Sequence, residues 1–310
     1  MRKGLEIHTW SKDQKGIIMK KMALAVFGIV VAVFLAACGG ESKKSETNAT
    51  NTTSQSSGTL AKIKENGVIR IGVFADKPPF GFIDEKNTNQ GYDIVFAKRI
   101  AAELLGDENK VQFVLVEAAN RVEFLRSDKV DVILANFTQT PERAQQVDFT
   151  LPYMKVSLGV VVPEGSEIAD EKGLKGKKLI VNKGTTADAY FTKNKDSLGL
   201  AEILRYDQNT ETFAALKDGR GDALSHDNAL LFAWAKDNVG FKVVVRELGE
   251  KDVIAGAVAK GNGELKGFID ELIVKLAGEQ FFHKAYDATL KNAFTSDISA
   301  DDVVIEGGKY

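Results

Sequence analysis

The chain of 310 residues has little cysteine, histidine and proline: one cysteine, three histidines and five prolines. A single cysteine excludes a disulfide framework and a Cys-based zinc site. The histidines (His8, His226 and His283) lie far apart in the sequence, which does not favour a His-rich metal site. We therefore expect neither a metal nor another cofactor.

The chain also lacks a strong excess of charge of either sign. It has 41 Lys and Arg residues against 43 Asp and Glu residues, a formal net charge of -2. A nucleic-acid-binding protein would need a basic surface, so the charge argues against a nucleic-acid partner. Hydrophobic residues at 44% and charged residues at 27% are ordinary for a folded protein, and the length favours two domains.

The most apolar run is residues 22–37 (MALAVFGIVVAVFLAA), which carries no charge. It is shorter than the roughly 20 residues that a membrane-spanning helix needs, and it follows Lys20 and Lys21. A basic segment, an apolar run and small residues at its end predict an export signal over residues 1–37. Met19 stands where such a signal normally begins; an extended basic region is the alternative.

The end of this run, LAAC (35–38), resembles the bacterial lipobox, in which the cysteine is diacylated and becomes the first residue of the mature protein. The resemblance implies a lipid anchor on Cys38, and two acyl chains hold a protein firmly at a membrane. The alternatives are a signal peptide with a chance cysteine and a signal anchor. Residues 41–58 are polar and aperiodic, so we expect residues 38–58 to be a solvated tether outside the cytoplasm.

From residue 60 onward, strand-like and helix-like stretches alternate. Residues 68–74, 111–116, 130–135, 241–246 and 253–258 have strand patterns, and residues 94–105 and 228–236 have helix patterns. Trp234, in the second of these helices, stands among apolar residues, which predicts a place in the core. This alternation predicts an α/β fold with parallel sheets and crossover helices.

Two apolar, β-branched stretches, residues 156–162 and 253–258, are candidates for connectors between two lobes. Lobe 1 would then comprise residues 59–157 and 254–310, and lobe 2 residues 158–253. A ligand would lie between the lobes, beyond the carboxyl ends of the strands.

The turn after residue 135 (NFTQTPER, 136–143) has the pattern of a strand end followed by a helix start. Thr140 suits the N-cap and Pro141 the first helical position. Exposed amides at a helix start suit an anion, and Arg143 can reach back as a bidentate partner for a carboxylate. The alternative is a helix cap with a solvated arginine.

Two further turns have the same pattern. In NKGTTAD (182–188), Gly184 permits close backbone approach, and Thr185 and Thr186 offer hydroxyls and amides at a helix start. It is not a P-loop, because the sequence GxxxxGK[ST] is absent. In GDALSHDN (221–228), Asp227 stands at a helix start, where it can bind an ammonium group or simply cap the helix.

Three more positions have two interpretations each. Asp93 precedes a long helix, which predicts an N-cap role. Phe80, in a loop after two prolines, is either a lid over a ligand or a core anchor. Arg121 either reads a ligand side chain or lies on a solvated helix face.

Together these turns supply an arginine and helix amides for a carboxylate and an aspartate for an ammonium group, which suits a free α-amino acid. Residues 60–295 also resemble the extracytoplasmic solute-binding proteins of polar amino-acid ABC transporters. The resemblance is carried by several ordered stretches: IRIGVFADKPPFGF (69–82), GYDIVFAKRIA (91–101), VDVILANFTQTPER (130–143), VDFTLPYM (147–154), KGTTA (183–187) and GDALSHDNALL (221–231).

The resemblance implies a two-lobed periplasmic-binding-protein-like α/β fold with two hinge strands, closure around the ligand, and delivery to a membrane permease with its ATPase. It implies that Arg143, Asn136 and Thr138 take the α-carboxylate from lobe 1, and Thr185 and Thr186 take it from lobe 2. Asp227 would take the α-ammonium, Phe80 would cover the ligand, and Arg121 would read its side chain. Nothing predicts an oligomer, so a monomer is expected.

The sequence also bears on which amino acid such a protein would bind. Residues 116–143 and 225–234 look closest to cysteine-binding members, and aspartate- or glutamate-binding members share some of the same pieces. An adhesive or sensory lipoprotein is the first alternative, and a dehydratase-like enzyme is the second. An enzyme would need an acid or base aimed at the substrate, and only His226 beside Asp227 suggests one.

Overall fold

The structure is a computed structural model that describes residues 58–310. The predicted signal peptide, Cys38 and all but the last residue of the predicted tether lie outside the described residues. In this part of the chain the strands are β1 (Ile69–Val73), β2 (Asp76–Lys77), β3 (Gly81–Ile83), β4 (Asn89–Gln90), β5 (Val111–Leu115), β6 (Val132–Ile133), β7 (Val147–Pro163), β8 (Lys178–Asn182), β9 (Glu202–Tyr206), β10 (Ala223–Asp227) and β11 (Phe241–Ala259). The helices are α1 (Thr59–Asn66), α2 (Tyr92–Leu105), α3 (Arg121–Arg126), α4 (Pro141–Ala144), the 3-10 helix η2 (Glu171–Leu174), α5 (Thr186–Lys193), α6 (Lys195–Leu198), α7 (Asn209–Lys217), α8 (Asn228–Asp237), α9 (Gly263–Ala277), α10 (Phe281–Thr289) and α11 (Ala300–Val303).

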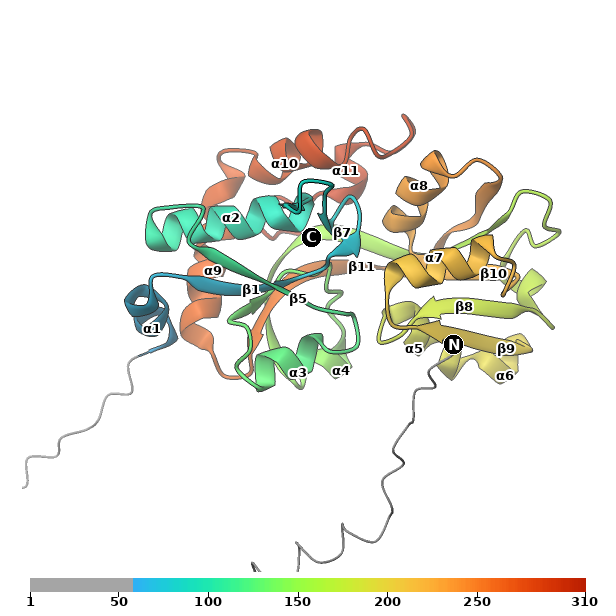
Figure 1. Ribbon diagram of the computed structural model, residues 1–310, viewed down its shortest axis with the longest axis horizontal. Coiled ribbons are helices and arrows are strands. Elements are labelled where there is room, and N and C mark those ends of the chain that lie inside the picture. The colour runs from blue at the N-terminus through green and yellow to red at the C-terminus, as the bar shows by residue number, and fades with distance from the viewer. Residues whose placement is uncertain (1–57) are drawn as a thin grey trace, which may run out of the picture. The chain divides into compact units, whose positions relative to one another are not determined.

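The main sheet has eight strands in the order β5-β1-β6-β11-β7-β10-β8-β9. We call β5, β1 and β6 with their helices the first half, and β10, β8 and β9 with theirs the second half. Strands pair in parallel within each half, and β11 and β7 lie antiparallel to their neighbours between them. Figure 1 shows α2, α9 and α10 around the first half and α5, α6, α7 and α8 around the second. The predicted two-lobed, parallel-rich α/β fold is confirmed.

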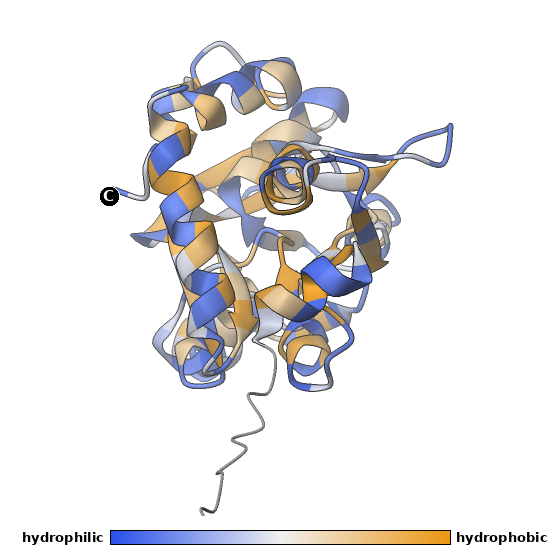
Figure 2. Ribbon diagram, turned by 90° about the vertical axis from the view of Figure 1, so that its left-hand side faces the viewer, coloured by the Kyte–Doolittle hydropathy of each residue, from blue (hydrophilic) through white to orange (hydrophobic). Residues whose placement is uncertain are grey.

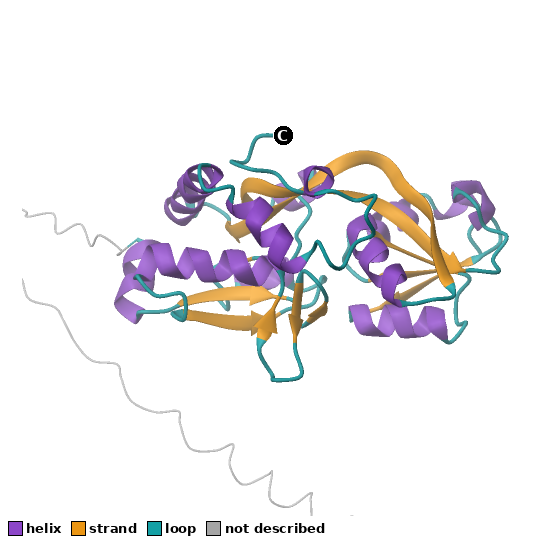
Figure 3. Ribbon diagram, turned by 90° about the horizontal axis from the view of Figure 1, so that it is seen from above, coloured by secondary structure: helices purple, strands orange, loops and turns teal. Residues whose placement is uncertain are grey.

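The two predicted connectors belong to longer strands. β7 has 17 residues and β11 has 19, and they pair from Val147 with Ala259 at one end to Pro163 with Phe241 at the other. Figure 3 shows these long strands crossing from one group of helices to the other. The prediction of separate strands at 241–246 and 253–258 is therefore wrong. The polar stretch between them looked like a loop, but it stays in the strand with register shifts on both sides of Leu248.

A small antiparallel sheet, β2-β3-β4, was not predicted. Its strands have only two or three residues each, too few for an alternating pattern. It joins β1 to α2, and it carries Lys77 and the loop with Phe80 to the edge of the first half.

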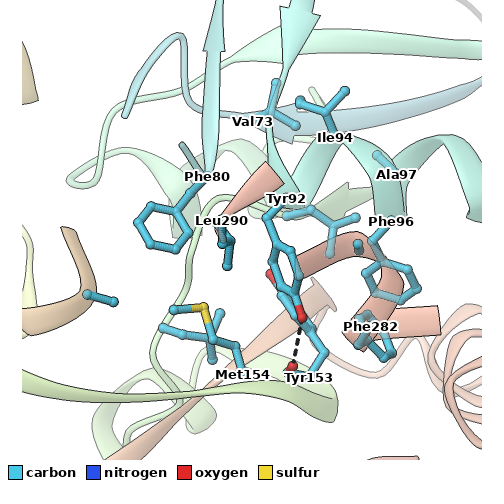
Figure 4. Close-up of a cluster of buried hydrophobic side chains, with 14 of the residues drawn as sticks. Val73, Phe80, Tyr92, Ile94, Phe96, Ala97, Tyr153, Met154, Phe282 and Leu290 are labelled. Carbon is cyan, nitrogen blue, oxygen red and sulfur yellow. Dashed lines mark hydrogen bonds between the residues drawn. The ribbon is translucent and has the colours of Figure 1, made fainter. Parts of the chain in front are cut away.

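The core of the first half is aromatic. Phe96 of α2 packs edge-on against Phe282 of α10 with ring centroids 5.0 Å apart, and Tyr153 of β7 stacks on Phe282 at 5.6 Å. Figure 4 shows Tyr92, Tyr153 and Phe282 grouped together, with Phe80 at one side of the cluster. In Figure 2 the strands are largely hydrophobic, while the helices carry both hydrophobic and hydrophilic residues, as amphipathic covering helices should.

In the second half, Trp234 of α8 stacks on Phe213 of α7 with ring centroids 4.6 Å apart. Its predicted place in the core is confirmed, although the side chain is only partly buried. Stacked aromatic pairs add roughly 0.5–1.5 kcal/mol beyond their buried area, so this pair fixes α7 against α8.

The C-terminal segment is tied to α10 through His283. Its Nδ1 lies 3.1 Å from Oε1 of Glu306, and its Nε2 lies 3.1 Å from Oδ1 of Asp301. Partial burial by itself lowers the pKa of His283, but the two carboxylates raise the pKa above its ordinary value. The charged imidazolium therefore holds the C-terminal segment on the first half.

We predict that His283→Gln destabilises the protein more at pH 6 than at pH 9. A raised folded-state pKa gives stability that is complete below the unfolded pKa, near 6.5, and is lost as pH rises through the folded pKa. The loss should stay below about 1 kcal/mol, since the histidine is partly exposed. Urea unfolding at both pH values measures it, with Lys291→Gln of the exposed Lys291–Asp287 pair as control. An equal loss at both pH values would contradict this assignment.

The two halves come into close contact where Gly184 meets Ala119. Gly184 has φ +77°, and a Cβ added there would lie 2.6 Å from Cα of Ala119 and 2.8 Å from its nitrogen. The predicted need for glycine at this turn is confirmed: both the positive φ and the close backbone approach exclude a side chain.

We predict that Gly184→Ala keeps the two halves apart. Gly219→Ala is the matched control, because Gly219 lies in the same half with φ +69° and has nothing within 4 Å of the added Cβ. Both variants should lose about 1–2 kcal/mol from the strained backbone. Only Gly184→Ala should increase the radius of gyration in small-angle X-ray scattering, and an unchanged radius would refute the close approach.

Candidate functional site

Three strand ends converge where the halves meet. Residues 136–143 lead from β6 to α4, residues 183–186 lead from β8 to α5, and Asp227 ends β10 and precedes α8. The three turns thus come from different strands, and each delivers a polar side chain or helix amides to the same contact region.

Arg143 bridges two of these turns. Its Nη1 donates to the carbonyl oxygen of Thr138 at 2.7 Å, and its Nη2 donates to the carbonyl oxygen of Gly184 at 3.0 Å. Its guanidinium carbon lies 4.8 Å from the centre of the Phe137 ring. Burial lowers the pKa of Arg143 to about 10, against the opposing charge of Asp227, so the group remains a cation at neutral pH. The alternative of a solvated arginine is wrong, because the guanidinium is held between the halves.

The predicted cap around Arg143 is confirmed. Thr140 is the N-cap of α4 and accepts from the backbone nitrogen of Arg143 at 3.2 Å, and Pro141 starts the helix. This cap fixes the first turn of α4 and therefore the direction in which Arg143 leaves the backbone.

Arg121 is buried, with 3% of its surface exposed, which excludes the solvated helix face. Its Nε donates to Ala118 O and its Nη1 to Ala135 O, both at 3.0 Å, and its guanidinium carbon lies 4.2 Å above the Phe137 ring. Burial and the neighbouring charge of Arg143 hold the pKa of Arg121 well below its ordinary value. Two cations that repel each other in a poorly solvated place favour an anion between or beside them.

Asn136 adopts a strained backbone, with φ +43°. Its backbone nitrogen donates to Oδ2 of Asp93 at 2.8 Å, and its buried Oδ1 has no hydrogen-bond partner in residues 58–310. Thr138 is buried too, and it pairs with Ile254 of β11 in an isolated bridge. Both residues lie in the turn from which the carbonyl oxygen of Thr138 accepts a hydrogen bond from Arg143.

The prediction that Asp93 caps α2 is wrong. Gly91 is the N-cap, and Asp93 lies in the first turn with its carboxylate turned to β7, where Oδ1 accepts from the Tyr153 hydroxyl at 2.7 Å. Burial raises the pKa of Asp93 to about 6, although these hydrogen bonds oppose the rise. Asp93 therefore fixes the strained turn at Asn136, a long-range role that the local sequence does not reveal.

Thr185 and Thr186 begin α5. Thr185 is the N-cap, and its hydroxyl accepts from the backbone nitrogen of Asp188 at 3.2 Å and donates to the carbonyl oxygen of Asn182 at 2.7 Å. Both threonines line a cavity of about 840 Å³ together with Arg143, Asp188 and Asp252. The capping role of Thr185 and its place beside Arg143 are thus compatible.

Asp227 does not use its side chain to cap α8. It stands at the N-cap position without a side-chain capping bond, and its Oδ2 accepts from Nζ of Lys77 at 2.8 Å. Burial alone would raise the pKa of Asp227, but the charge of Lys77 holds it well below the ordinary value. Lys77 was not predicted; the only signal was a lysine between Asp76 and two prolines in a mostly apolar stretch.

Phe80 is fully buried and belongs to the main core cluster, which includes Tyr92 and Phe282. Nζ of Lys77 lies 5.9 Å from its ring centre and 5.4 Å from that of Phe74. Phe80 is thus a core anchor that also contacts the charged region.

His226 is buried beside Asp227, and its Nδ1 accepts from the backbone nitrogen of Asp227 at 2.7 Å. Burial, with the charge of Lys77, holds the pKa of His226 below its ordinary value. The ring is therefore neutral, with its proton on Nε2, which has no hydrogen-bond partner in the described part of the chain.

The predicted residues divide into two groups. Arg143, Thr185 and Thr186 line the same cavity. The others are buried outside its lining: Phe80, Arg121, Asn136, Thr138 and Asp227. Among residues 58–310, no cluster of His, Cys, Asp or Glu is arranged to hold a metal ion. Over the same residues, no helix has the length and apolarity of a membrane span.

Comparison with known proteins identifies relatives of the whole folded region. The cysteine-binding protein of Campylobacter jejuni is 70% identical, with a TM-score of 0.78, and the match covers 80% of this chain and 99% of that one. The solute receptor for L-cysteine of Neisseria gonorrhoeae is 54% identical over the same shares, with a TM-score of 0.77. The ABC transporter glutamine-binding protein of Bacillus subtilis is 32% identical over 276 residues, 88% of this chain and 98% of that protein.

A family model describing bacterial extracellular solute-binding proteins, family 3, matches residues 69–291. This match confirms the resemblance that the sequence stretches carried. The chain is a member of the family 3 bacterial extracellular solute-binding proteins.

Proposed function

We propose that the protein is the substrate-binding receptor of an ABC importer and holds an L-amino acid between the two halves of its sheet. The observation that carries this proposal is the convergence of Arg143, the α5 start and Asp227 from three strand ends. Partners for a carboxylate and a partner for an ammonium group then lie in one contact region, as a zwitterion requires. Relatives that bind amino acids support the same function.

The α-carboxylate would replace the backbone carbonyls as the partner of Arg143. Both Nη atoms donate to carbonyl oxygens without a ligand, so the guanidinium is already oriented toward the α5 start. The backbone amides of Thr185 and Thr186 supply the positive end of a helix. Asn136 and Thr138 contribute from the β6 turn, where the buried Oδ1 of Asn136 lacks a partner in the described residues.

The α-ammonium would bind to the carboxylate of Asp227, which stays ionised. Phe80 would bound the site on the side of the first half, since its ring is buried near Lys77. Arg121 would act on the ligand side chain from beside Phe137, through the charge it adds near Arg143.

L-cysteine is the substrate we propose first, on the strength of two relatives named for cysteine at 70% and 54% identity. Aspartate or glutamate is the second candidate, because the excess of buried cations at Lys77, Arg121 and Arg143 favours an anionic side chain. Cystine, the oxidised form, belongs in the same comparison.

Transport follows from movement of the halves. Lobe 1 (59–157 and 254–310) and lobe 2 (158–253) would bend about β7 and β11, and the register shift between Leu248 and Asp252 supports a hinge there. The closed form would be presented to a membrane permease, and a partner ATPase would supply the energy. We propose that the protein acts as a monomer, anchored outside the cytoplasm by lipid on Cys38.

An enzymatic function finds less support. The neutral His226 already accepts a backbone hydrogen bond at Nδ1, so this nitrogen is not available to take a proton from a substrate. The relatives compared are named as binding proteins or receptors.

Isothermal titration of the purified protein tests the substrate. L-cysteine under reducing conditions should bind tightly, and L-cystine, L-aspartate and L-glutamate should bind more weakly. Tight binding of aspartate or glutamate instead would assign the protein to the acidic amino acids. If none of the four amino acids binds to the folded protein, the receptor function is refuted.

Arg143→Ala should weaken L-cysteine binding roughly tenfold to a hundredfold. The variant loses a charged hydrogen-bond partner of the carboxylate, worth about 1.5–3 kcal/mol, and each 1.4 kcal/mol is tenfold in Kd. The control is Arg220→Ala, which removes an exposed arginine paired with Asp218. If both variants bind like the wild type, Arg143 is not the carboxylate partner.

A further inference from the structure

The ion pair between Lys77 and Asp227 joins the two halves through groups that are almost completely buried. Nζ of Lys77, in β2, lies 2.8 Å from Oδ2 of Asp227, at the end of β10, and their side chains are only 2% and 6% exposed. The two residues are 150 positions apart in the chain. The pair forms only when β2 of the first half meets β10 of the second.

Lys77 depends on this partner. A buried ammonium is costly unless it is paired and hydrogen-bonded, and Asp227 is the one acceptor found for Nζ of Lys77 within residues 58–310. The rings of Phe74 and Phe80 lie beside Nζ of Lys77, and the positive charge of Arg121 repels it. Another cation that takes Oδ2 of Asp227 must displace Lys77 from that oxygen.

The α-ammonium of an amino acid is that other cation. It is chemically the same group as the end of a lysine side chain, with three N–H donors and one positive charge. Building on the proposed function, in which Asp227 receives the ligand ammonium, we propose that Lys77 is an internal competitor for the ammonium subsite. Its ammonium occupies Asp227 in the unliganded protein, holds the halves together, and is displaced when an amino acid binds.

This competition lowers the affinity for every ligand that uses Asp227. The apparent Kd equals the intrinsic Kd divided by the fraction of protein whose site is open to the ligand. Lys77 therefore sets the affinity without being a preferred contact of the ligand.

The test is isothermal titration of L-cysteine into Lys77→Met, which keeps the length and apolar stem of the side chain but removes its charge. We expect binding about tenfold tighter than in the wild type, as for a site that is blocked nine-tenths of the time. Lys129→Met is the matched control, since this exposed lysine lies over Phe124, away from the contact between the halves. Unchanged or weaker binding by Lys77→Met would overturn the proposal.

Asp227→Asn separates this inference from the proposed function. Weakened binding by Asp227→Asn together with unchanged binding by Lys77→Met overturns the competition alone. Wild-type affinity in Asp227→Asn overturns the ammonium subsite and the competition with it. No binding of any tested amino acid by the wild type overturns the receptor function itself.

A spectroscopic measurement covers the case in which Lys77→Met does not fold. In ¹⁵N-lysine-labelled wild-type protein, a buried, hydrogen-bonded ammonium gives a slowly exchanging Nζ signal, which Lys77→Arg should abolish and thereby assign. L-cysteine should shift or remove that signal at saturation. A signal that stays unchanged in the saturated complex would show that Lys77 keeps Asp227, contrary to the proposal.

Discussion

The antiparallel pairing of β7 with β11 is the constraint on which the rest of the structure depends. Each strand runs from one half of the sheet to the other, so each half is built on one end of the same pair. At one end the pair adjoins β6, and at the other it adjoins β10. The turns that follow β6, β8 and β10 consequently meet at the middle of the pair, where the halves come together.

The two halves place charged side chains at this contact, where little water reaches them. Arg121, Arg143 and Lys77 are cations, and Asp227 is their carboxylate counterpart across the contact. The arginines are satisfied by backbone carbonyls and Asp227 by Lys77. Each of these interactions resembles one that an amino acid can make, so under the proposed function a ligand would take over partners that the site already provides.

The sequence predicted the elements and turns whose signals are local. Thr140 with Pro141, Gly184 and Thr185 follow from capping and backbone rules, and the structure has them as expected. Contacts between distant residues could not be predicted this way. The local sequence at Asp93 predicts a helix cap, but its carboxylate accepts hydrogen bonds from Asn136 and Tyr153. The local sequence at Lys77 is that of a surface residue, but in the fold its ammonium pairs with Asp227 of β10. The long β11 was missed because its polar stretch pairs with β7 only at Leu248 and Asp252, with register shifts between the pairs that leave no periodic pattern in the sequence.

The central claim is that an amino acid binds at the contact between the halves, with its two charged groups on Arg143 and Asp227. A crystal structure of the protein with bound L-cysteine tests it most directly. The account predicts the ligand carboxylate within hydrogen-bond distance of both Nη atoms of Arg143 and the ammonium on Oδ2 of Asp227. A ligand bound elsewhere, or bound with its ammonium away from Asp227, would contradict the account.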